Sequence, residues 1–128
     1  MENWTSEELR EAIKAISSMI ERTEKVKEKF EQGTSQCTLL VNRLKALNIA
    51  SFLMSKELAE SNVMNSYTRG DYINAAAPIA SLISKSEKAQ KKLTQVSWQH
   101  TMLANNLKAL YIAAPLLTRA LDVTGAGN

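Results

Sequence analysis

The sequence repeats itself at an offset of 63 residues. Residues 4–58 align with residues 67–121 without a gap, and 21 of these 55 pairs are identical. The strongest block pairs residues 44–50 with residues 107–113. A match of this length indicates a tandem duplication, so both halves should adopt the same local structure. We expect repeat units at residues 4–62 and 67–121.

Each repeat begins with a helix N-terminal signature. Thr5 precedes Glu8 by three residues, and Thr68 precedes Asp71 by the same spacing, as in a capping box. Apolar residues then recur three or four positions apart, which is the spacing of one helix face. In the first repeat these residues are Leu9, Ile13, Ile16, Ile20 and, further along, Phe30. The pattern predicts a helix that extends toward residues 32–35.

Residues 32–35 interrupt this pattern and separate the two helices of the first repeat. Gly33 suits a left-handed C-terminal cap, and Thr34 or Ser35 can cap the next helix. The second helix of this repeat has an apolar stripe of its own: Leu40, Leu44, Leu47, Met54 and Leu58. The second repeat has the same plan, and residues 61–66 are expected to link the two repeats.

Only four glycines and two prolines are present in 128 residues, which favours long helices over a β fold rich in turns. We therefore predict an all-α fold in a single domain, residues 1–128. The expected architecture is a four-helix up-and-down bundle of two tandem helical hairpins, related by a pseudo-twofold axis. Residues 122–128 are expected to form a flexible tail.

The second helix of each repeat has more apolar surface than one core contact requires. From residue 36 to residue 54 the only charged side chains are Arg43 and Lys45. Beside the main stripe lies another: Leu39, Ala46, Ala50 and Leu53, with the counterparts Met102, Ala109, Ala113 and Leu116. Two explanations are open. These helices pack side by side in the centre of the bundle, or the extra stripe is an interface for a homodimer or a helical protein partner.

The two prolines lie in the second repeat only, at Pro78 and Pro115. Each should bend its helix and free a backbone carbonyl. Antiparallel packing places the two bends at one level of the bundle. There they produce either a curved end of the bundle or a small apolar pocket. The candidate pocket residues are Ala75, Ala76, Pro78, Ala113, Ala114 and Pro115.

Polar residues shared by both repeats form a row on one helix face. They are Thr38, Asn42 and Lys45, with the counterparts Thr101, Asn105 and Lys108. The asparagines either fix register inside an interface or belong to a solvated face, and the lysines in the row favour the solvated face. Cys37 and His100 occupy equivalent positions, but two ligands do not make a metal site, so neither a metal nor a cofactor is expected.

Several compositional features bear on function. No catalytic motif is present, so an enzyme is not expected. The lysines at positions 85, 88, 91 and 92 have the composition of a solvated face, which makes nucleic-acid binding unlikely. A single cysteine and the lack of a signal peptide or membrane span indicate a cytoplasmic protein. We expect a non-catalytic interaction or assembly module, with a small apolar-ligand-binding bundle as the alternative and a nucleic-acid accessory protein as a weaker one.

Overall fold

A computed structural model describes residues 3–59, 67–93 and 97–126. Within these ranges the chain is all-helical, with four helices: α1 (Ser6–Lys27), α2 (Ser35–Ala59), α3 (Arg69–Lys91) and α4 (Trp98–Ala126). The all-α prediction is therefore confirmed for this part of the chain. The expected linker, residues 61–66, lies outside the described residues. So do residues 127–128 of the expected tail, whereas residues 122–126 are helical.

The helix starts follow from local capping. Thr5 and Thr68 both form the expected capping boxes, with Glu8 and Asp71 as the reciprocal carboxylates. The Thr34 hydroxyl accepts a hydrogen bond from the backbone N–H of Cys37 at 3.2 Å, so Thr34 is the N-terminal cap of α2. Capping thus fixes where these three helices begin.

The end of α1 differs from the sequence prediction. α1 ends at Lys27, so Phe30 lies in the following turn and is not part of the helical stripe. Gly33 has the left-handed conformation expected of it, with φ at 87°, but it sits in the turn and not directly after the helix. Consecutive hydrogen bonds from the N–H groups of Lys29 and Phe30 back to α1 carbonyls tighten this end.

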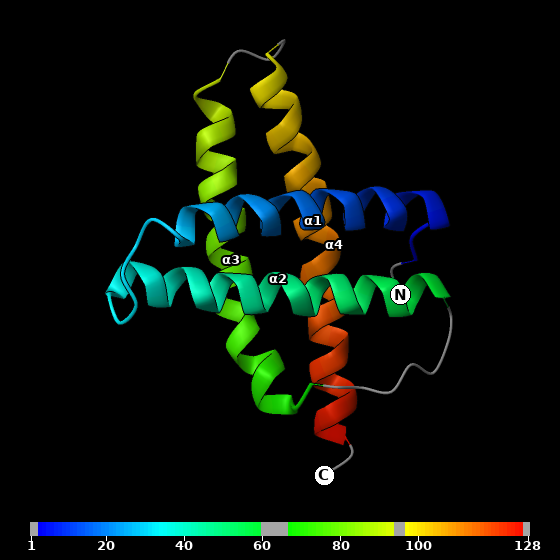
Figure 1. Cartoon of the computed structure of the whole chain (residues 1–128). Helices are drawn as coiled ribbons and strands as arrows, with labels where there is room; N and C mark the ends of the chain where they lie inside the picture. The colour runs from blue at the N-terminus through cyan, green and yellow to red at the C-terminus, as the bar shows by residue number, and fades with distance from the viewer. Residues whose placement is uncertain (1–2, 60–66, 94–96, 127–128) are drawn as a thin grey trace.

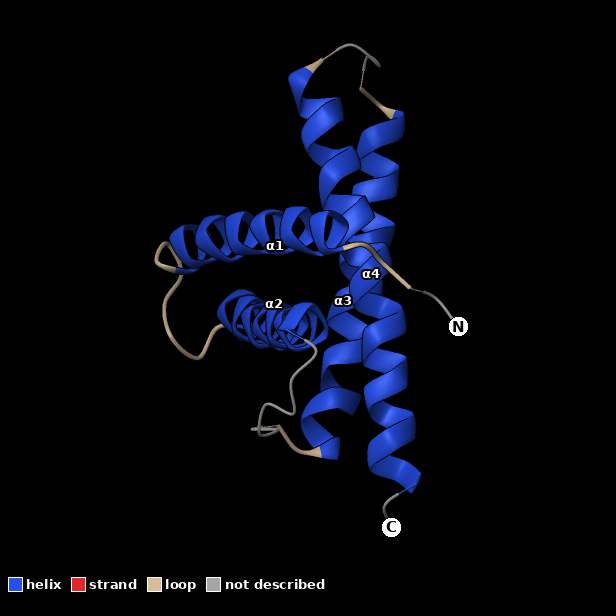
Figure 2. Cartoon of the chain, turned by 90° about the vertical axis from the view of Figure 1, so that its right-hand side faces the viewer, coloured by secondary structure: helices blue, strands red, loops and turns tan. Residues whose placement is uncertain are grey.

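The four helices form two antiparallel hairpins that are stacked in two layers. In Figure 1 the α1–α2 hairpin lies across the upright α3–α4 hairpin, and Figure 2 shows the same crossing after a quarter turn. The expected up-and-down alignment of all four helices is therefore wrong: the helices run antiparallel only within each hairpin. In Figure 1 both ends of each hairpin extend beyond the crossing.

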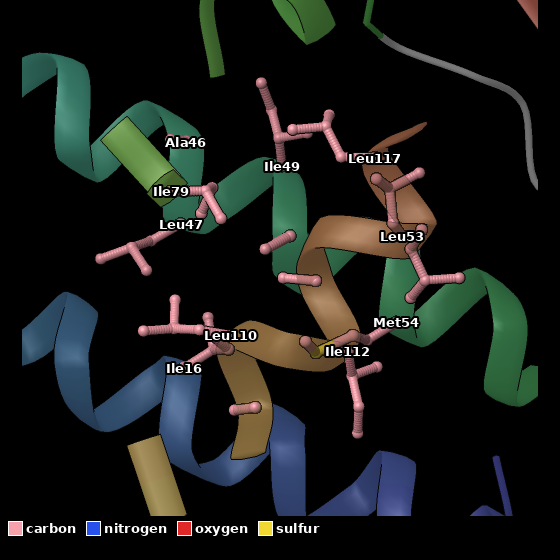
Figure 3. Packing of buried hydrophobic residues seen from close by; sticks show 14 of the residues in the cluster. Ile16, Ala46, Leu47, Ile49, Leu53, Met54, Ile79, Leu110, Ile112 and Leu117 are labelled. Atoms are coloured by element: carbon pink, nitrogen blue, oxygen red, sulfur yellow. The ribbon is translucent and has the colours of Figure 1, made fainter. Parts of the chain in front are cut away.

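The core lies where the hairpins cross. α2 contacts α4 in the centre, α1 also contacts α4, and α2 also contacts α3, whereas α1 and α3 make no contact within the described ranges. Figure 3 shows Ile16, Leu47 and Leu110 from three different helices pointing toward one another. All three side chains are fully buried. Two explanations were open for the extra apolar surface of α2 and α4. The contact between these helices supports the first, in which the second helix of each repeat packs in the centre of the fold.

An ion pair joins the hairpins at the C-terminal ends of α2 and α4. The Arg119 guanidinium lies 3.1 Å from a Glu57 carboxylate oxygen and also stacks over the Trp4 ring, at 5.8 Å from its centroid. Both charged side chains remain about one-third exposed, so the pair orients the hairpins more than it stabilises them.

α2 is the one described helix whose length and composition suit a membrane span. Its most apolar window has a mean hydropathy of 1.2, and 50% of that window is buried within the fold. Core helices of soluble proteins pass the same test, so the burial of Leu47, Ile49 and Met54 already accounts for this composition.

Candidate functional site

Large apolar side chains stand exposed where the α1–α2 hairpin ends. Val26 is 42% exposed, Phe30 is 39% exposed and Val41 is 46% exposed. Because α1 stops at Lys27, the turn that follows carries Phe30 outward instead of into the core. This end of the hairpin projects to the side of the α3–α4 hairpin (Figure 1). We call Val26, Phe30 and Val41 the tip surface.

A groove of about 430 Å³ lies at the tip surface, between the end of α1 and the start of α2. Its lining residues are Lys27, Glu28, Phe30, Gln32, Gly33, Cys37, Thr38 and Val41. No atom lies within 4 Å of the position that a side chain on Gly33 would occupy, so this wall of the groove is open. The groove is therefore accessible to a side chain from outside.

The matching end of the α3–α4 hairpin is less apolar. The counterparts of the tip surface are Ala89, Leu93 and Ala104, which are smaller or less exposed. Trp98 is 70% exposed there, and α3 and the residue after it carry exposed lysines at positions 85, 88, 91 and 92. Among the residues that the structure describes, a clustered apolar surface is thus a feature of the first hairpin and not of its counterpart.

The extra stripe predicted as a candidate interface lies mostly inside the fold. The core includes six of its eight residues: Ala46, Ala50, Leu53, Ala109, Ala113 and Leu116. Leu39 is 49% exposed and Met102 is partly exposed. The six buried residues form the contact between hairpins, because small alanine side chains let crossing helices approach closely. They offer no surface to a partner while the chain is folded this way.

The candidate pocket residues differ in burial. Ala113 and Ala75 are core residues, Ala76 is exposed, and Ala114 and Pro115 are partly buried. A groove does contain Ala75 and Pro78, but its opposite wall is α2, not α4. The pocket shared by the two prolines stays a prediction, and the groove at Pro78 is formed by α2 and α3.

The row of polar residues shared by both repeats lies on the surface. This is the arrangement that the lysines in the row favoured. All six residues are exposed. Asn42 and Lys45 line the groove between α2 and α3, whereas Thr101, Asn105 and Lys108 line a groove between α1 and α4. These five residues thus mark the edges of two grooves where the hairpins meet, whereas Thr38 lines the groove at the tip surface.

Two carboxylates at these grooves, those of Asp71 and Glu8, also belong to helix caps. The Lys45 ammonium lies 2.9 Å from an Asp71 carboxylate oxygen. The hydrogen bond from Lys45, and next the bond from the Thr68 backbone N–H, lower the pKa of Asp71. At the other groove the Thr5 backbone N–H and hydroxyl lower the pKa of Glu8, with a smaller effect of Lys108. These carboxylates act as caps and pair partners, which leaves neither free as a proton donor near neutral pH.

The remaining candidates do not assemble into chemical sites. Cys37 is buried and His100 is half-buried, in the first turns of α2 and α4, which Figure 1 places at the projecting ends of different hairpins. Within the described ranges no group of three His, Cys, Asp or Glu side chains is arranged to hold a metal. On α3, Glu87 accepts a hydrogen bond from the Tyr111 hydroxyl, which raises the pKa of Tyr111.

The sequence interpretation missed the tip surface because it assigned Phe30 to the helical stripe. A signal was nevertheless present. Val26 and Phe30 are the only uncharged residues between positions 24 and 31, so both apolar residues are embedded in a hydrophilic segment. Apolar residues in such a segment are candidates for exposure.

Comparison with known proteins adds no family assignment. The chain matches no family model, and no curated protein sequence and no solved structure shows significant similarity to it.

Proposed function

We propose that this protein is a non-catalytic interaction module that associates through its tip surface, most simply as a homodimer. The single observation that carries the proposal is that Phe30 and Val41, each more than one-third exposed, line one open groove at a projecting hairpin end, while the exposed Val26 lies in the last turn of α1. Contiguous exposed apolar surface on a folded protein marks an interaction site more often than isolated apolar residues do.

The tip surface combines a protruding aromatic ring with a groove. Such a patch is self-complementary, because Phe30 of one copy can enter the groove beside Val41 of another while the reverse contact forms by symmetry. Burial of an aromatic side chain supplies roughly 1.5–3 kcal/mol of transfer free energy. Two such contacts per dimer, with Val26 beside them, give an interface centred on a few residues.

We further infer that the two hairpins are related by a pseudo-twofold axis that arose by duplication. Support comes from the two grooves between hairpins. Adding 63 to the α1 positions 8, 11, 12, 14, 15 and 18 of one groove gives the α3 positions 71, 74, 75, 77, 78 and 81 of the other. The α4 residues Met102, Asn105, Lys108 and Ala109 correspond in the same way to Leu39, Asn42, Lys45 and Ala46.

A reducing, cytoplasmic setting and a non-enzymatic role complete the proposal. Cys37 is a buried free thiol with no second cysteine to pair with. Glu8, Asp71 and Tyr111 have shifted pKa values, and all three are engaged in caps or surface hydrogen bonds. This pattern suits structural roles better than general acid or base catalysis.

The test is sedimentation velocity on the wild type and on a Phe30→Asp, Val41→Asp double variant. We expect a concentration-dependent dimer for the wild type and a helical monomer for the double variant. Ile73→Asp is the matched control, because Ile73 on α3 is 48% exposed and also β-branched like Val41. A wild type that stays monomeric at high micromolar concentration refutes the homodimer. A dimer lost equally in the Ile73 variant refutes the tip surface as its site.

A further inference from the structure

The C-terminal end of α3 carries a row of lysines with no acidic residue on the same face. Lys85, Lys88 and Lys92 are exposed, and their spacing of three and four residues places them on one side of the helix and its C-terminal cap. Within the described ranges no carboxylate forms an ion pair with any of them. Glu87 is the only acidic residue between positions 84 and 94, and its carboxylate accepts a hydrogen bond from Tyr111 on α4 instead. The face with the lysine row therefore carries positive charge only.

The equivalent end of the first hairpin has a balanced charge. Residues 21–31 contain four basic and four acidic side chains, whereas the equivalent residues 84–94 contain four basic side chains and one acidic side chain. Three carboxylates of the first repeat are thus without an acidic counterpart, at positions 84, 91 and 94 of the second. Interspersed charges of both signs are typical of a solvated helix face. Solvation therefore explains the charges of the first hairpin end, whereas the excess of lysines at the second calls for a further explanation.

An exposed tryptophan lies at the same end of the α3–α4 hairpin. α4 begins at Trp98, which is 70% exposed, the highest value among the large apolar side chains of the described residues. Because the hairpin is antiparallel, the end of α3 and the start of α4 lie side by side, and both views show this end beyond α1 and α2 (Figures 1 and 2). Trp98 does not belong to the core, so burial within the fold does not account for it. Tryptophan is enriched where an apolar ring meets a polar boundary, which points to a partner at this end.

The shape and composition of this end favour a flat anionic surface over a nucleic-acid strand. Lys85 and Lys91 are six residues apart, about 9 Å along the helix axis, so the positive charges act together within roughly one Debye length at about 0.1 M salt. A protruding end can touch a flat surface without obstruction by the α1–α2 hairpin. Single-stranded nucleic acid is instead held in a basic groove in which successive bases stack on aromatic rings. Among the described residues only Trp98 offers a free ring at this end, because Tyr111 is engaged by Glu87.

We propose that this end of the α3–α4 hairpin binds the surface of an anionic membrane as a peripheral contact, with Lys85, Lys88 and Lys92 against the lipid headgroups and Trp98 at the interface. Tryptophan rings are enriched at the headgroup level of bilayers, and each lysine near an anionic leaflet raises the affinity about fivefold. The cytoplasmic leaflet carries such negative charge, so the contact agrees with the proposed cytoplasmic setting. It lies on the other hairpin from the tip surface, so it stands or falls independently of the homodimer.

The test is cosedimentation with vesicles of phosphatidylcholine alone and of phosphatidylcholine mixed equally with phosphatidylserine. We expect binding to the anionic vesicles that weakens as salt is added, and no binding to the neutral vesicles. In Trp4→Phe, which leaves Trp98 as the single tryptophan, the fluorescence emission should shift to shorter wavelength on binding. Equal binding to both kinds of vesicle, or to neither, overturns the proposal. Tighter binding of a single-stranded oligonucleotide than of the anionic vesicles at the same salt also overturns it, and makes nucleic acid the partner.

Two triple variants separate the site from the net charge of the protein. The first carries Lys85→Gln, Lys88→Gln and Lys92→Gln, and its affinity for anionic vesicles should fall about a hundredfold, the product of three fivefold effects. The matched control changes the equivalent positions of the first hairpin: Arg22→Gln, Lys25→Gln and Lys29→Gln. All six side chains are exposed, so both variants should keep the helical content of the wild type in circular dichroism. Both lose the same charge, so the control should bind within about twofold of the wild type if the site is local. An equal loss of affinity in the two variants, or no loss in the first, overturns the proposal.

Discussion

Ala113 allows a direct test of how the two hairpins meet. Its side chain is 1% exposed within the core at the crossing. Replacing it with glutamate inserts a longer, ionisable side chain where no basic group is available in the apolar cluster. We expect Ala113→Glu to unfold the chain at neutral pH, and not to release a folded monomer from an assembly.

The magnitude follows from burial. A fully buried glutamate has its pKa raised by up to about 3–5 units, and each unit corresponds to roughly 1.36 kcal/mol at a pH where the side chain would otherwise be ionised. Overpacking by the added methylenes costs a further 1–3 kcal/mol, roughly. At pH 7 the ionisation part is limited to roughly 3.5 kcal/mol, because this pH lies only about 2.7 units above the unfolded-state pKa of about 4.3. The sum, about 5–7 kcal/mol, is comparable with the whole free energy of unfolding of an ordinary domain.

The assay is thermal unfolding followed by far-ultraviolet circular dichroism at pH 7 and pH 4. The folded-state pKa of the new carboxyl is raised above its unfolded value of about 4.3, so the ionisation penalty is absent below that value and grows as the pH rises toward the folded-state pKa. The difference in melting temperature between Ala113→Glu and wild type should therefore be smaller at pH 4. Ala76→Glu is the matched control, since Ala76 is exposed, and its cost should stay within about 0.5 kcal/mol.

One result refutes this reasoning. If Ala113→Glu melts at the temperature of the Ala76→Glu control, then Ala113 is not enclosed between the hairpins. A folded monomeric variant of a dimeric wild type would restore the extra stripe as an intermolecular interface.

Three further outcomes are expected. Leu47→Ala and Leu110→Ala, at equivalent and fully buried positions, should each lower the free energy of unfolding by about 3–5 kcal/mol in urea titrations, and a cost below about 1 kcal/mol would contradict their burial. Thr68→Ala should cost about 1 kcal/mol by the same measurement through loss of the α3 cap. Lys45→Met should raise the pKa of Asp71 in an NMR titration of its carboxyl group, because the principal cause of its depression is removed.

The sequence was sufficient to predict the helices and the faces of the helices that are buried in the core. Capping boxes at Thr5 and Thr68 and the apolar stripe through Leu47 depend on residues within a turn or two of each other, so local spacing reveals them. The same stripe leaves the crossing angle undetermined, because an alanine-rich face fits a neighbouring helix at more than one inclination. The angle at which the hairpins cross could therefore be determined only from the structure.

The candidate sites were less accessible to prediction. The groove between α1 and α4 unites residues more than eighty positions apart, whose proximity follows from the crossing and not from any periodicity. The tip surface depends on where α1 ends, and no glycine or proline stands at Lys27 to mark that end. Helix ends without such residues are the least well predicted feature of a helical sequence.

Because one complete hairpin is stacked on another, the structure also indicates the order in which contacts form during folding. Contacts within a hairpin close short loops, whereas contacts between hairpins, such as that of Arg119 with Glu57, join residues 62 positions apart. Loop-closure entropy must be overcome before such distant contacts become favourable, so the hairpins should form early and their docking should cross the main kinetic barrier. Substitutions that destabilise a hairpin should then slow refolding, because its contacts are already present at that barrier, and substitutions at the alanine contact should change the refolding rate to the extent that docking has begun there.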